Sequence, residues 1–246
     1  FPTKPPPFSR QGVSEDDLID FTPELREKAR AVVAGLEFGS LFSPARLLDP
    51  DNGYRGTLRV PRSTGGANWE GGAVDPETGI LYVTSAMSPR VEGLLPGQEG
   101  MDIDYMLMPG QPLSVDGLPA VKPPYGQITA IDLNRGEILW QIANADTPEE
   151  IANHPALAGI ELPRTGRPSR VGLLATRTLL FAGEGVGGEP ILRAYDKATG
   201  EVLAEIALPA AQTGLPMSYM LEGAQYVVVA VGDRNNPAEL VALTLP

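Results

Sequence analysis

The stretch AIDLNRGEILW at residues 130–140 recurs as AYDKATGEVLA at 194–204 and, more weakly, as AVDPETGILY at 73–82. Each copy has an apolar run, an Asp-x-x-Thr-Gly turn (with Arg135 in place of Thr in the first) and a second apolar run. The aspartate accepts hydrogen bonds from turn amides, and the glycine supplies the positive φ that the turn requires. The spacing between copies corresponds to one four-stranded propeller blade plus insertions. Because blades stacked around an axis bury the faces that one blade exposes, the repeat predicts an all-β fold, a β-propeller.

Short β-like runs continue this pattern from Gly56 onward, broken by the many Gly (28) and Pro (25) residues. The predicted strands are Thr57–Val60, Gly72–Asp75, Ile80–Ser85, Gln127–Asp132, Ile138–Ile142, Arg170–Ala175, Leu179–Gly183, Ile191–Asp196, Val202–Ala207, Met217–Leu221, Tyr226–Val231 and Leu240–Leu245. Two inserts rich in Pro and Gly, residues 86–124 and 143–169, are predicted to be loops over one face. The predicted strands therefore place propeller blades at 57–246.

The N-terminal quarter has a different texture. Residues 1–12 are rich in Pro and predict an extended connector, and residues 13–56 predict a helical segment. Within it, 13–35 is the convincing helical stretch. Thr22 and Pro23 form a start signal, and Gly35 is a plausible stop.

Composition excludes several classes of function. The net charge of −12 leaves no basic stripe for nucleic acid or an anionic membrane. The chain has no Cys and one His, which excludes disulfides, thiolate chemistry and multi-histidine metal sites. No apolar run approaches the roughly 20 residues of a membrane-spanning helix, and no signal-peptide pattern opens the chain. The first residue is Phe, which leads us to expect processing or a longer parent chain.

Other candidate motifs favour structural interpretations. The run 183–188 (GEGVGG) resembles a dinucleotide fingerprint, but a strand follows it, so we predict a hairpin loop. His154 is expected to be a surface histidine, with general base as the minority interpretation. Asp102 and Asp104 alternate with apolar residues, which favours a solvated edge over a carboxylate pair. The nearby Met101, Met106 and Met108 are predicted to fill gaps under a loop; alternatively, they line an apolar cavity.

The most unusual stretch is GGANWEGG at residues 65–72. Glycine pairs let a backbone approach a ligand closely, and tryptophan offers a flat face and an N–H group. A buried tryptophan in a β-bulge is the competing and, on composition alone, the favoured interpretation.

Together these residues resemble a known family, the pyrroloquinoline-quinone (PQQ) dependent dehydrogenases. The run 65–83 (GGANWEGGAVDPETGILYV) resembles the start of one of their blades, and 130–140 resembles their Ala-x-Asp-x-x-Thr-Gly-x-x-x-Trp docking motif. Further matches are PPYGQITAID at 123–132, LRAYD at 192–196, LPA at 208–210 with LPMSY at 215–219, YVVVA at 226–230 and LVAL at 240–243. Their order most resembles the membrane-type quinoprotein glucose dehydrogenase branch.

The resemblance implies an eight-bladed propeller with PQQ near the axis and Ca²⁺ beside it. The whole chain, 1–246, is then expected to be one partial propeller of about four blades that opens at a helical segment between blades, 13–56. A carboxylate base takes the proton of a sugar or alcohol hydroxyl while hydride passes to PQQ, and the electrons leave to ubiquinone or a cytochrome. The resemblance further implies a location in the bacterial periplasm. Because this branch of the family carries its membrane anchor at the N-terminus, attachment of the protein to the membrane stays open. Asn68 and Trp69 are carried over as cofactor-binding residues near the quinone, and Thr213 as a position where the last blade's backbone approaches PQQ.

Departures from the family pattern limit this expectation. Ala204 stands where the docking Trp is expected, and 165–171 lacks the usual Gly-Gly-Pro run. The Ca²⁺ ligands, the base and the missing N-terminal half of the propeller are expected upstream of Phe1, so the chain alone is expected to be an inactive C-terminal portion. The alternatives are a non-enzymatic propeller scaffold of the assembly type and a small-molecule binder without a redox step.

Overall fold

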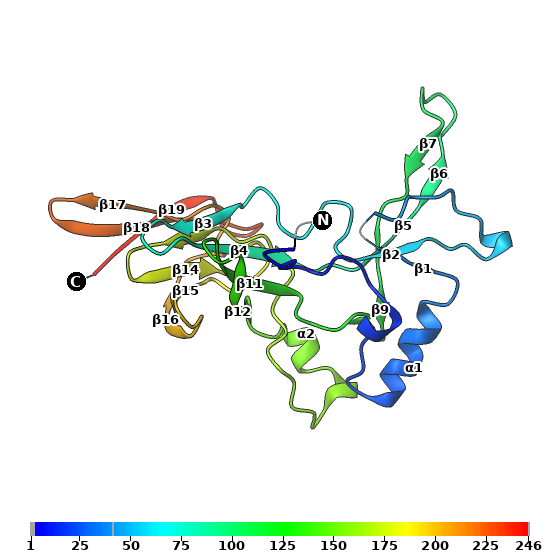
Figure 1. Cartoon of the computed structure of the whole chain (residues 1–246), viewed down its shortest axis with the longest axis horizontal. Coiled ribbons are helices and arrows are strands. Elements are labelled where there is room, and N and C mark those ends of the chain that lie inside the picture. Colours follow the sequence, from blue (N-terminus) through cyan, green and yellow to red (C-terminus); the bar gives the residue numbers. More distant parts are fainter. Residues whose placement is uncertain (1–2, 41, 246) are drawn as a thin grey trace.

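The computed structural model describes residues 3–40 and 42–245, which form a lobe of antiparallel sheets beside a lobe built around a helix (Figure 1). The helices are α1 (Pro23–Val32) and α2 (Glu149–Ala152), with 3₁₀ turns at Glu15–Asp17, Pro50–Asn52 and Pro155–Leu157. The strands are β1 (Glu37–Phe38), β2 (Thr57–Arg59), β3 (Gly72–Asp75), β4 (Ile80–Ala86), β5 (Arg90–Glu92), β6 (Leu94–Pro96), β7 (Tyr105–Leu107), β8 (Gln111–Pro112), β9 (Ser114–Val115), β10 (Leu118–Pro119), β11 (Gly126–Asp132), β12 (Glu137–Ala143), β13 (Leu173–Ala175), β14 (Leu179–Gly183), β15 (Ile191–Asp196), β16 (Val202–Ala207), β17 (Met217–Leu221), β18 (Ala224–Val231) and β19 (Glu239–Thr244).

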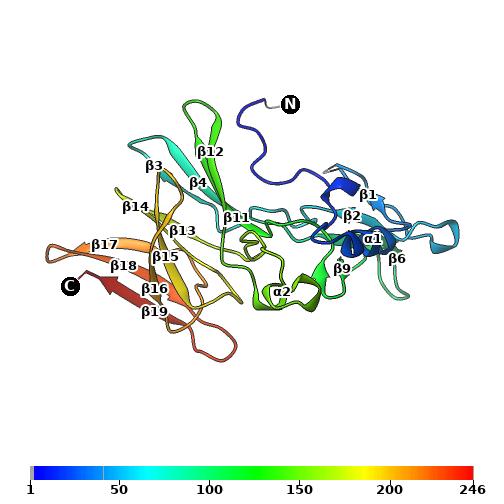
Figure 2. The same cartoon turned by 90° about the horizontal axis from the view of Figure 1, so that it is seen from below.

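Three antiparallel sheets follow one another along the chain and confirm the all-β prediction. Their strand orders are β12-β11-β4-β3, β13-β14-β15-β16 and β17-β18-β19. Every strand predicted from Gly72 onward lies in one of them, with ends within three residues of those predicted. The sheets stack through shared apolar faces: Ile128 of the first packs with Leu180 of the second, and Leu192 of the second packs with Val229 of the third. Figure 2 shows these sheets turned about one another on one side of the molecule.

The repeated turns have the predicted chemistry. Asp132 accepts hydrogen bonds from the amides of Asn134 (2.9 Å) and Arg135 (3.1 Å), and Asp196 accepts them from Ala198 (2.8 Å) and Thr199 (2.9 Å). The closing glycines at 79, 136 and 200 have φ of 73°, 67° and 77°. The repeat therefore encodes the hairpins of successive sheets.

Trp140 joins the first sheet to the turn of the second. Its Nε1 donates to the carbonyl oxygen of Lys197 over 3.0 Å, and its ring lies 5.8 Å from that of Tyr82. A Cβ atom on Gly200 would stand 3.0 Å from the Trp140 ring, so the turn glycine and the indole are in contact. The Nζ atom of Lys197 in turn binds Asp75 of the first sheet over 2.6 Å.

The helical segment is shorter than predicted. The Thr22 side chain caps α1, accepting from the amide of Leu25 over 3.1 Å, as the sequence indicates. The expectation of a helix from residue 13 is wrong, because Leu18 and Ile19 are extended and pair with the first insert. The amide of Ile19 donates to Ala120 over 3.0 Å, so tertiary pairing overrides the local helical pattern there.

The two inserts hold more structure than the predicted loops. Residues 86–124 contain β5 to β10, and β5 and β8 join β2 and the parallel strand β1 in a mixed sheet. The predicted strand at Thr57–Val60 is confirmed as β2 and belongs to this sheet. The β6–β7 hairpin projects from the molecule (Figure 1). Strands of two or three residues show no readable period, which explains why the sequence prediction missed them.

The second insert, residues 143–169, contains α2 and the 3₁₀ turn Pro155–Leu157. Both inserts pack with α1 around Leu25, Leu118 and Ile151. No helix in the described part of the chain is long and apolar enough to cross a lipid bilayer.

Candidate functional site

The glycine-rich loop 65–72 leads into β3 and places Asn68 at the rim of a pocket. The loop turns on itself: Asn68 Nδ2 donates to the Thr64 carbonyl (2.9 Å), and Asn68 Oδ1 accepts from the Trp69 amide (2.9 Å). Gly71 has a φ of 60° and donates to the Asn68 carbonyl over 3.0 Å. This turn orders the half-buried Asn68 side chain and leaves its second amide hydrogen for another partner.

Trp69 lies on the outside of this loop, with 90% of its surface exposed. The interpretation as a buried tryptophan in a β-bulge is therefore wrong. Gly65 has a φ of 81°, and the carbonyl of Gly66 accepts a hydrogen bond from the amide of Ala86 over 2.9 Å. The loop therefore lies against β4, and its turn directs the indole of Trp69 outward.

The pocket beside Asn68, here called the loop pocket, is small and polar. Its volume is about 40 Å³, which is room for a few water molecules. Its walls are the glycine loop, β4 and the segment 168–170, and they include Arg62, Glu70 and Arg170. Glu70 and Arg170 form an ion pair of 3.1 Å across it.

A larger pocket, here called the main pocket, adjoins the loop pocket and shares Ser88, Pro168 and Ser169 with it. Its volume is about 350 Å³, within the range of small-molecule sites. Both inserts and the hairpin loop after β14 contribute to its walls. The lining residues are Met87, Ser88, Pro89, Arg90, Pro112, Leu113, Ser114, Gly117, Pro119, Tyr125, Pro148, Glu150, Ile151, Arg167, Pro168, Ser169 and Val186.

The segment 165–170, which separates the two pockets, is held by close backbone contacts. A Cβ atom on Gly126 would collide with the carbonyl oxygen of Arg167, and one on Gly185 would collide with that of Arg170. The amide of Tyr125 donates to the Thr165 carbonyl over 2.7 Å. The side-chain oxygen of Ser169 donates to the Glu184 carbonyl. This wall is therefore placed by the glycines that face it.

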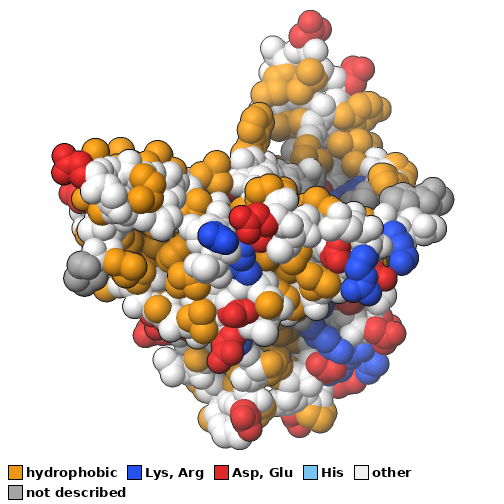
Figure 3. Space-filling view, turned by 60° about the vertical axis from the view of Figure 1, so that its left-hand side comes forward, with side chains coloured by type: hydrophobic (Ala, Val, Ile, Leu, Met, Phe, Trp, Pro, Cys, Tyr) orange, Lys and Arg blue, Asp and Glu red, His pale blue; other side chains and the backbone are white. Residues whose placement is uncertain are grey.

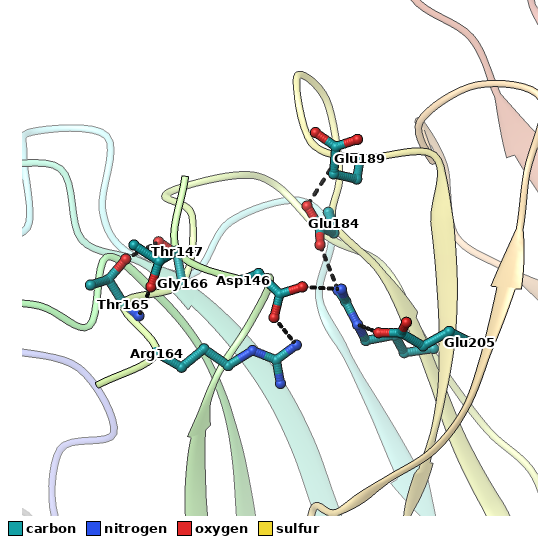
Figure 4. Close-up of polar contacts among 9 residues, drawn as sticks. Asp146, Thr147, Arg164, Thr165, Gly166, Glu184, Glu189 and Glu205 are labelled. Carbon is teal, nitrogen blue, oxygen red and sulfur yellow. Dashed lines mark hydrogen bonds and ion pairs between the residues drawn. The ribbon is translucent and has the colours of Figure 1, made fainter. Parts of the chain in front are cut away.

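A buried ion cluster around Arg193 supports the same wall (Figure 4). The fully buried guanidinium contacts Glu184 (2.6 Å), Glu205 (2.7 Å) and Asp146 (2.8 Å), and Asp146 also binds Arg164 over 2.6 Å. Burial lowers the pKa of Arg193, but hydrogen bonds to Glu184 and Glu205 outweigh it and raise the pKa overall. The cluster ties the second insert to β15 and β16.

Sequence reasoning missed this cluster, because its members are separated along the chain and carry no common motif. Its prediction that 183–188 is a hairpin loop is confirmed, since β14 and β15 flank it. No local sequence pattern indicated that Glu184 in that loop pairs with Arg193.

Thr213 lies away from both pockets. Its side chain is exposed, and its amide donates to Ala230 in the third sheet over 2.8 Å. The neighbouring Gln212 is buried; it accepts from the amide of Gly183 in β14 (2.6 Å) and donates to the carbonyl of Gly172, just before β13 (2.8 Å). Of the three sequence-predicted cofactor residues, the structure places Asn68 at a pocket and leaves Trp69 and Thr213 on the surface.

The other titratable candidates, His154, Asp102 and Asp104, either bond only to the backbone or are exposed to solvent. His154 is half-buried and bonds the Asp116 carbonyl (2.8 Å) and the amide of Ala156 (3.2 Å). Asp102 and Asp104 are exposed on the β6–β7 hairpin. In residues 3–40 and 42–245 no three acidic or histidine side chains are grouped to hold a metal ion.

Comparisons with known proteins agree with this architecture. Residues 1–227 match the family model "PQQ: Glucose/ethanol/alcohol dehydrogenase, beta-propeller domain". Quinate/shikimate dehydrogenase (quinone) of Acinetobacter baylyi is 28% identical over 94% of this chain and 30% of its own length. Quinoprotein glucose dehydrogenase of Escherichia coli is 30% identical over 74% of this chain and 25% of its own.

Among solved structures, quinohemoprotein alcohol dehydrogenase from Comamonas testosteroni has a TM-score of 0.51 at 22% identity, over 73% of this chain and 26% of that one, which shows likeness of fold. The chain spans about a third of the length of the curated relatives it matches. Because the family model covers nearly all of it, this chain belongs to the PQQ-dependent glucose/ethanol/alcohol dehydrogenase β-propeller family.

Proposed function

We propose that this chain forms the C-terminal blades of a periplasmic PQQ-dependent dehydrogenase that oxidises a hydroxyl group of a sugar or alcohol. Ubiquinone or a cytochrome takes the electrons. The observation that carries the proposal is the family match over residues 1–227 together with the position of Asn68 at a polar pocket. Relatives named for glucose, quinate and glycerol define the range of candidate substrates.

The residues around Asn68 suit contact with one edge of a planar, anionic cofactor that lies outside the loop pocket, because the pocket itself has room only for a few water molecules. Asn68 has a free amide hydrogen for a carbonyl or carboxylate oxygen, and Arg62 adds a cation on the same rim. Gly65 and Gly66 remove side chains from the approach to the loop. The exposed ring of Trp69 is a flat face on which a ring system can stack.

When bound, PQQ would supply a quinone as the hydride acceptor, and Ca²⁺ would supply Lewis acidity. In this scheme Asn68 holds an oxygen of the cofactor by donating through Nδ2. The turn 64–71 keeps that donor in place, because both hydrogen-bonding atoms of the amide are already oriented by Thr64 and Trp69. We assign no residue of this chain as Ca²⁺ ligand or catalytic base.

The division of the chain is part of the proposal. Residues 57–246 contribute the blades, 13–56 a segment between blades and 1–12 a connector. The third sheet exposes Met217 (53%), Leu221 (52%) and Leu240 (76%), and apolar side chains are widespread on the face shown in Figure 3. An exposed apolar sheet face favours a covered position in the assembled protein, which we propose is supplied by the rest of the propeller.

The test uses the full-length enzyme reconstituted with PQQ and Ca²⁺. We expect Asn68→Ala to weaken PQQ binding about tenfold, the effect of one lost hydrogen bond of about 1.4 kcal/mol. Equilibrium titration of PQQ and dye-linked dehydrogenase activity are the two measurements. Asn235→Ala, in an exposed loop of the third sheet, is the matched control. Unchanged PQQ affinity in the Asn68 variant, or no dehydrogenase activity in the parent, would favour a propeller scaffold instead.

A further inference from the structure

Four arginines surround the two adjoining pockets. Arg90 and Arg167 line the main pocket, and Arg62 and Arg170 line the loop pocket. Two glutamates, Glu70 and Glu150, are the only carboxylates among the lining residues that the structure describes. In a chain of net charge −12, this concentration of cations marks the pockets as different from the rest of the surface.

Three of these arginines have no carboxylate partner in the described ranges 3–40 and 42–245. Arg170 pairs with Glu70, whereas Arg62, Arg90 and Arg167 form no ion pair within 4.0 Å. Arg30 and Arg46 each have a glutamate within 2.8 Å, whereas Arg55, Arg177 and Arg234, among the residues that the structure describes, form no ion pair either. What distinguishes Arg62, Arg90 and Arg167 is that they line the pockets, where their positive charge is available to a ligand.

Arg90 is the best-placed of the three. It is half-buried, its stem packs 3.4–3.6 Å from where a Cβ on Gly110 would lie, and its Nη1 donates to the Pro89 carbonyl over 3.0 Å. Burial and the nearby Arg62 lower the pKa of Arg90, and the charge of Glu92, which is paired with Arg59, opposes this without reversing it. A partly desolvated cation beside a second cation is unfavourable by itself, and a bound anion offsets that cost.

We propose that the main pocket binds the carboxylate of a hydroxy-acid substrate through Arg90 and Arg167. This inference rests on the proposed function, because it names the substrate class of that same dehydrogenase. Guanidinium groups bind carboxylates with paired, charge-assisted hydrogen bonds. The hydroxyls of Ser88, Ser114 and Ser169 on the same walls suit the neutral hydroxyls of such a substrate. A volume of about 350 Å³ accommodates a six-membered ring carrying these groups.

A carboxylate could come from the substrate or from PQQ, which itself carries carboxylates. We commit to the substrate, because the main pocket adjoins the loop pocket that holds Asn68 and is separated from it by the wall 168–169. The experiment distinguishes the two sources by measuring PQQ affinity separately.

The test compares the full-length, PQQ-loaded parent with an Arg90→Gln/Arg167→Gln variant. Arg177→Gln is the matched control, because Arg177 is exposed between β13 and β14 and lines neither pocket. Calorimetry measures binding of cyclohexanecarboxylate, which has no hydroxyl to oxidise, and of its neutral analogue cyclohexanecarboxamide. Steady-state kinetics with quinate and with glycerol measure kcat/KM for an anionic and a neutral substrate.

We expect the double variant to lose about 10- to 100-fold in carboxylate affinity and in kcat/KM for quinate. Carboxamide binding, kcat/KM for glycerol and PQQ affinity stay within about twofold of the parent. Equal losses for the carboxylate and the carboxamide, or no loss for either, would overturn the inference. A loss of PQQ affinity would overturn it too, assigning the arginines to the cofactor. Selective carboxylate binding in a protein without dehydrogenase activity would uphold the anion site and refute the proposed function.

Discussion

Arg193→Met removes the cation that faces the buried carboxylate of Glu184, and it tests how the pocket wall is held. Glu184 has 2% of its side chain exposed, whereas Glu205 and Asp146, the other two partners, are 51% and 64% exposed. In the variant Glu184 keeps the amide of Glu189 at 3.0 Å as a donor but has lost its counter-charge. Breaking a buried pair from one side costs about 3–5 kcal/mol of unfolding free energy.

Variants of the two exposed partners, Glu205 and Asp146, give the loss of stability with which Arg193→Met is compared. Glu205→Gln and Asp146→Asn remove solvated carboxylates, so each is expected to cost no more than about 1 kcal/mol. The double variant Arg193→Met/Glu184→Met replaces the pair by apolar side chains of similar length. It is expected to recover most of the loss, because no unpaired charge stays buried.

Urea unfolding of the full-length protein, followed by near-ultraviolet circular dichroism and by fluorescence, measures these differences. Coincidence of the two probes for each variant is the condition for comparing free energies. If Arg193→Met costs no more than Glu205→Gln, or if the double variant is less stable than Arg193→Met, the account of Glu184 as the buried member of the cluster is refuted.

Two further predictions concern the junction of the first two sheets. Trp140→Phe keeps a ring against Gly200 but loses the hydrogen bond to Lys197, so it is expected to lower the free energy of unfolding by about 1 kcal/mol. Trp140→Ala removes the ring as well and is expected to lower it by about 3 kcal/mol. Equal effects of the two variants in thermal unfolding would contradict the assigned contacts. Hydrogen bonding to Lys197 lowers the pKa of Asp75 from 3.8 to about 2, so this pair stabilises the fold above about pH 4 and its contribution is lost as the pH falls toward about 2. Asp75→Asn should therefore be less stable than the parent at pH 6, with a difference that shrinks over that window; a constant difference from pH 6 to pH 2 would contradict the pKa assignment.

The repeated strands could be predicted from the sequence because their signals are local. Asp132 and Asp196 fix their turns through amides two and three residues away, and the alternation of apolar residues around them sets the strands. The helix start at Thr22 is equally local. The helix was predicted too long because the pairing of Ile19 with Ala120 depends on residues a hundred positions away.

The candidate site was only partly predictable for the same reason. Asn68 stands out in the sequence for its glycine-rich surroundings, and the structure places it at the rim of the loop pocket; its contact with a cofactor stays a prediction. The main pocket could not, because its walls come from two inserts whose short strands lack a period. The charge pattern of Arg90 and Arg167 becomes visible only once the fold brings them to one pocket. Trp69 was assigned to the interior on residue type, whereas the turn of its loop directs it outward.

The indole of Trp140 has one more consequence, which concerns how the sheets lose structure. Ala130 pairs with Trp140 and Ala194 pairs with Ala204, each just before the same irregularity in register, so Ala204 occupies the equivalent place in the second sheet. The Trp140 ring and its hydrogen bond thus connect the first sheet to the second. At the corresponding place the second sheet has only the methyl group of Ala204 to contact the third. In a stack of units coupled to their neighbours, opening begins where coupling is weakest. The third sheet is held to the second by Gln212 and by a shared apolar cluster but lacks the tryptophan contact, so we expect it to open first and its backbone amides to exchange with solvent before those of the first two sheets.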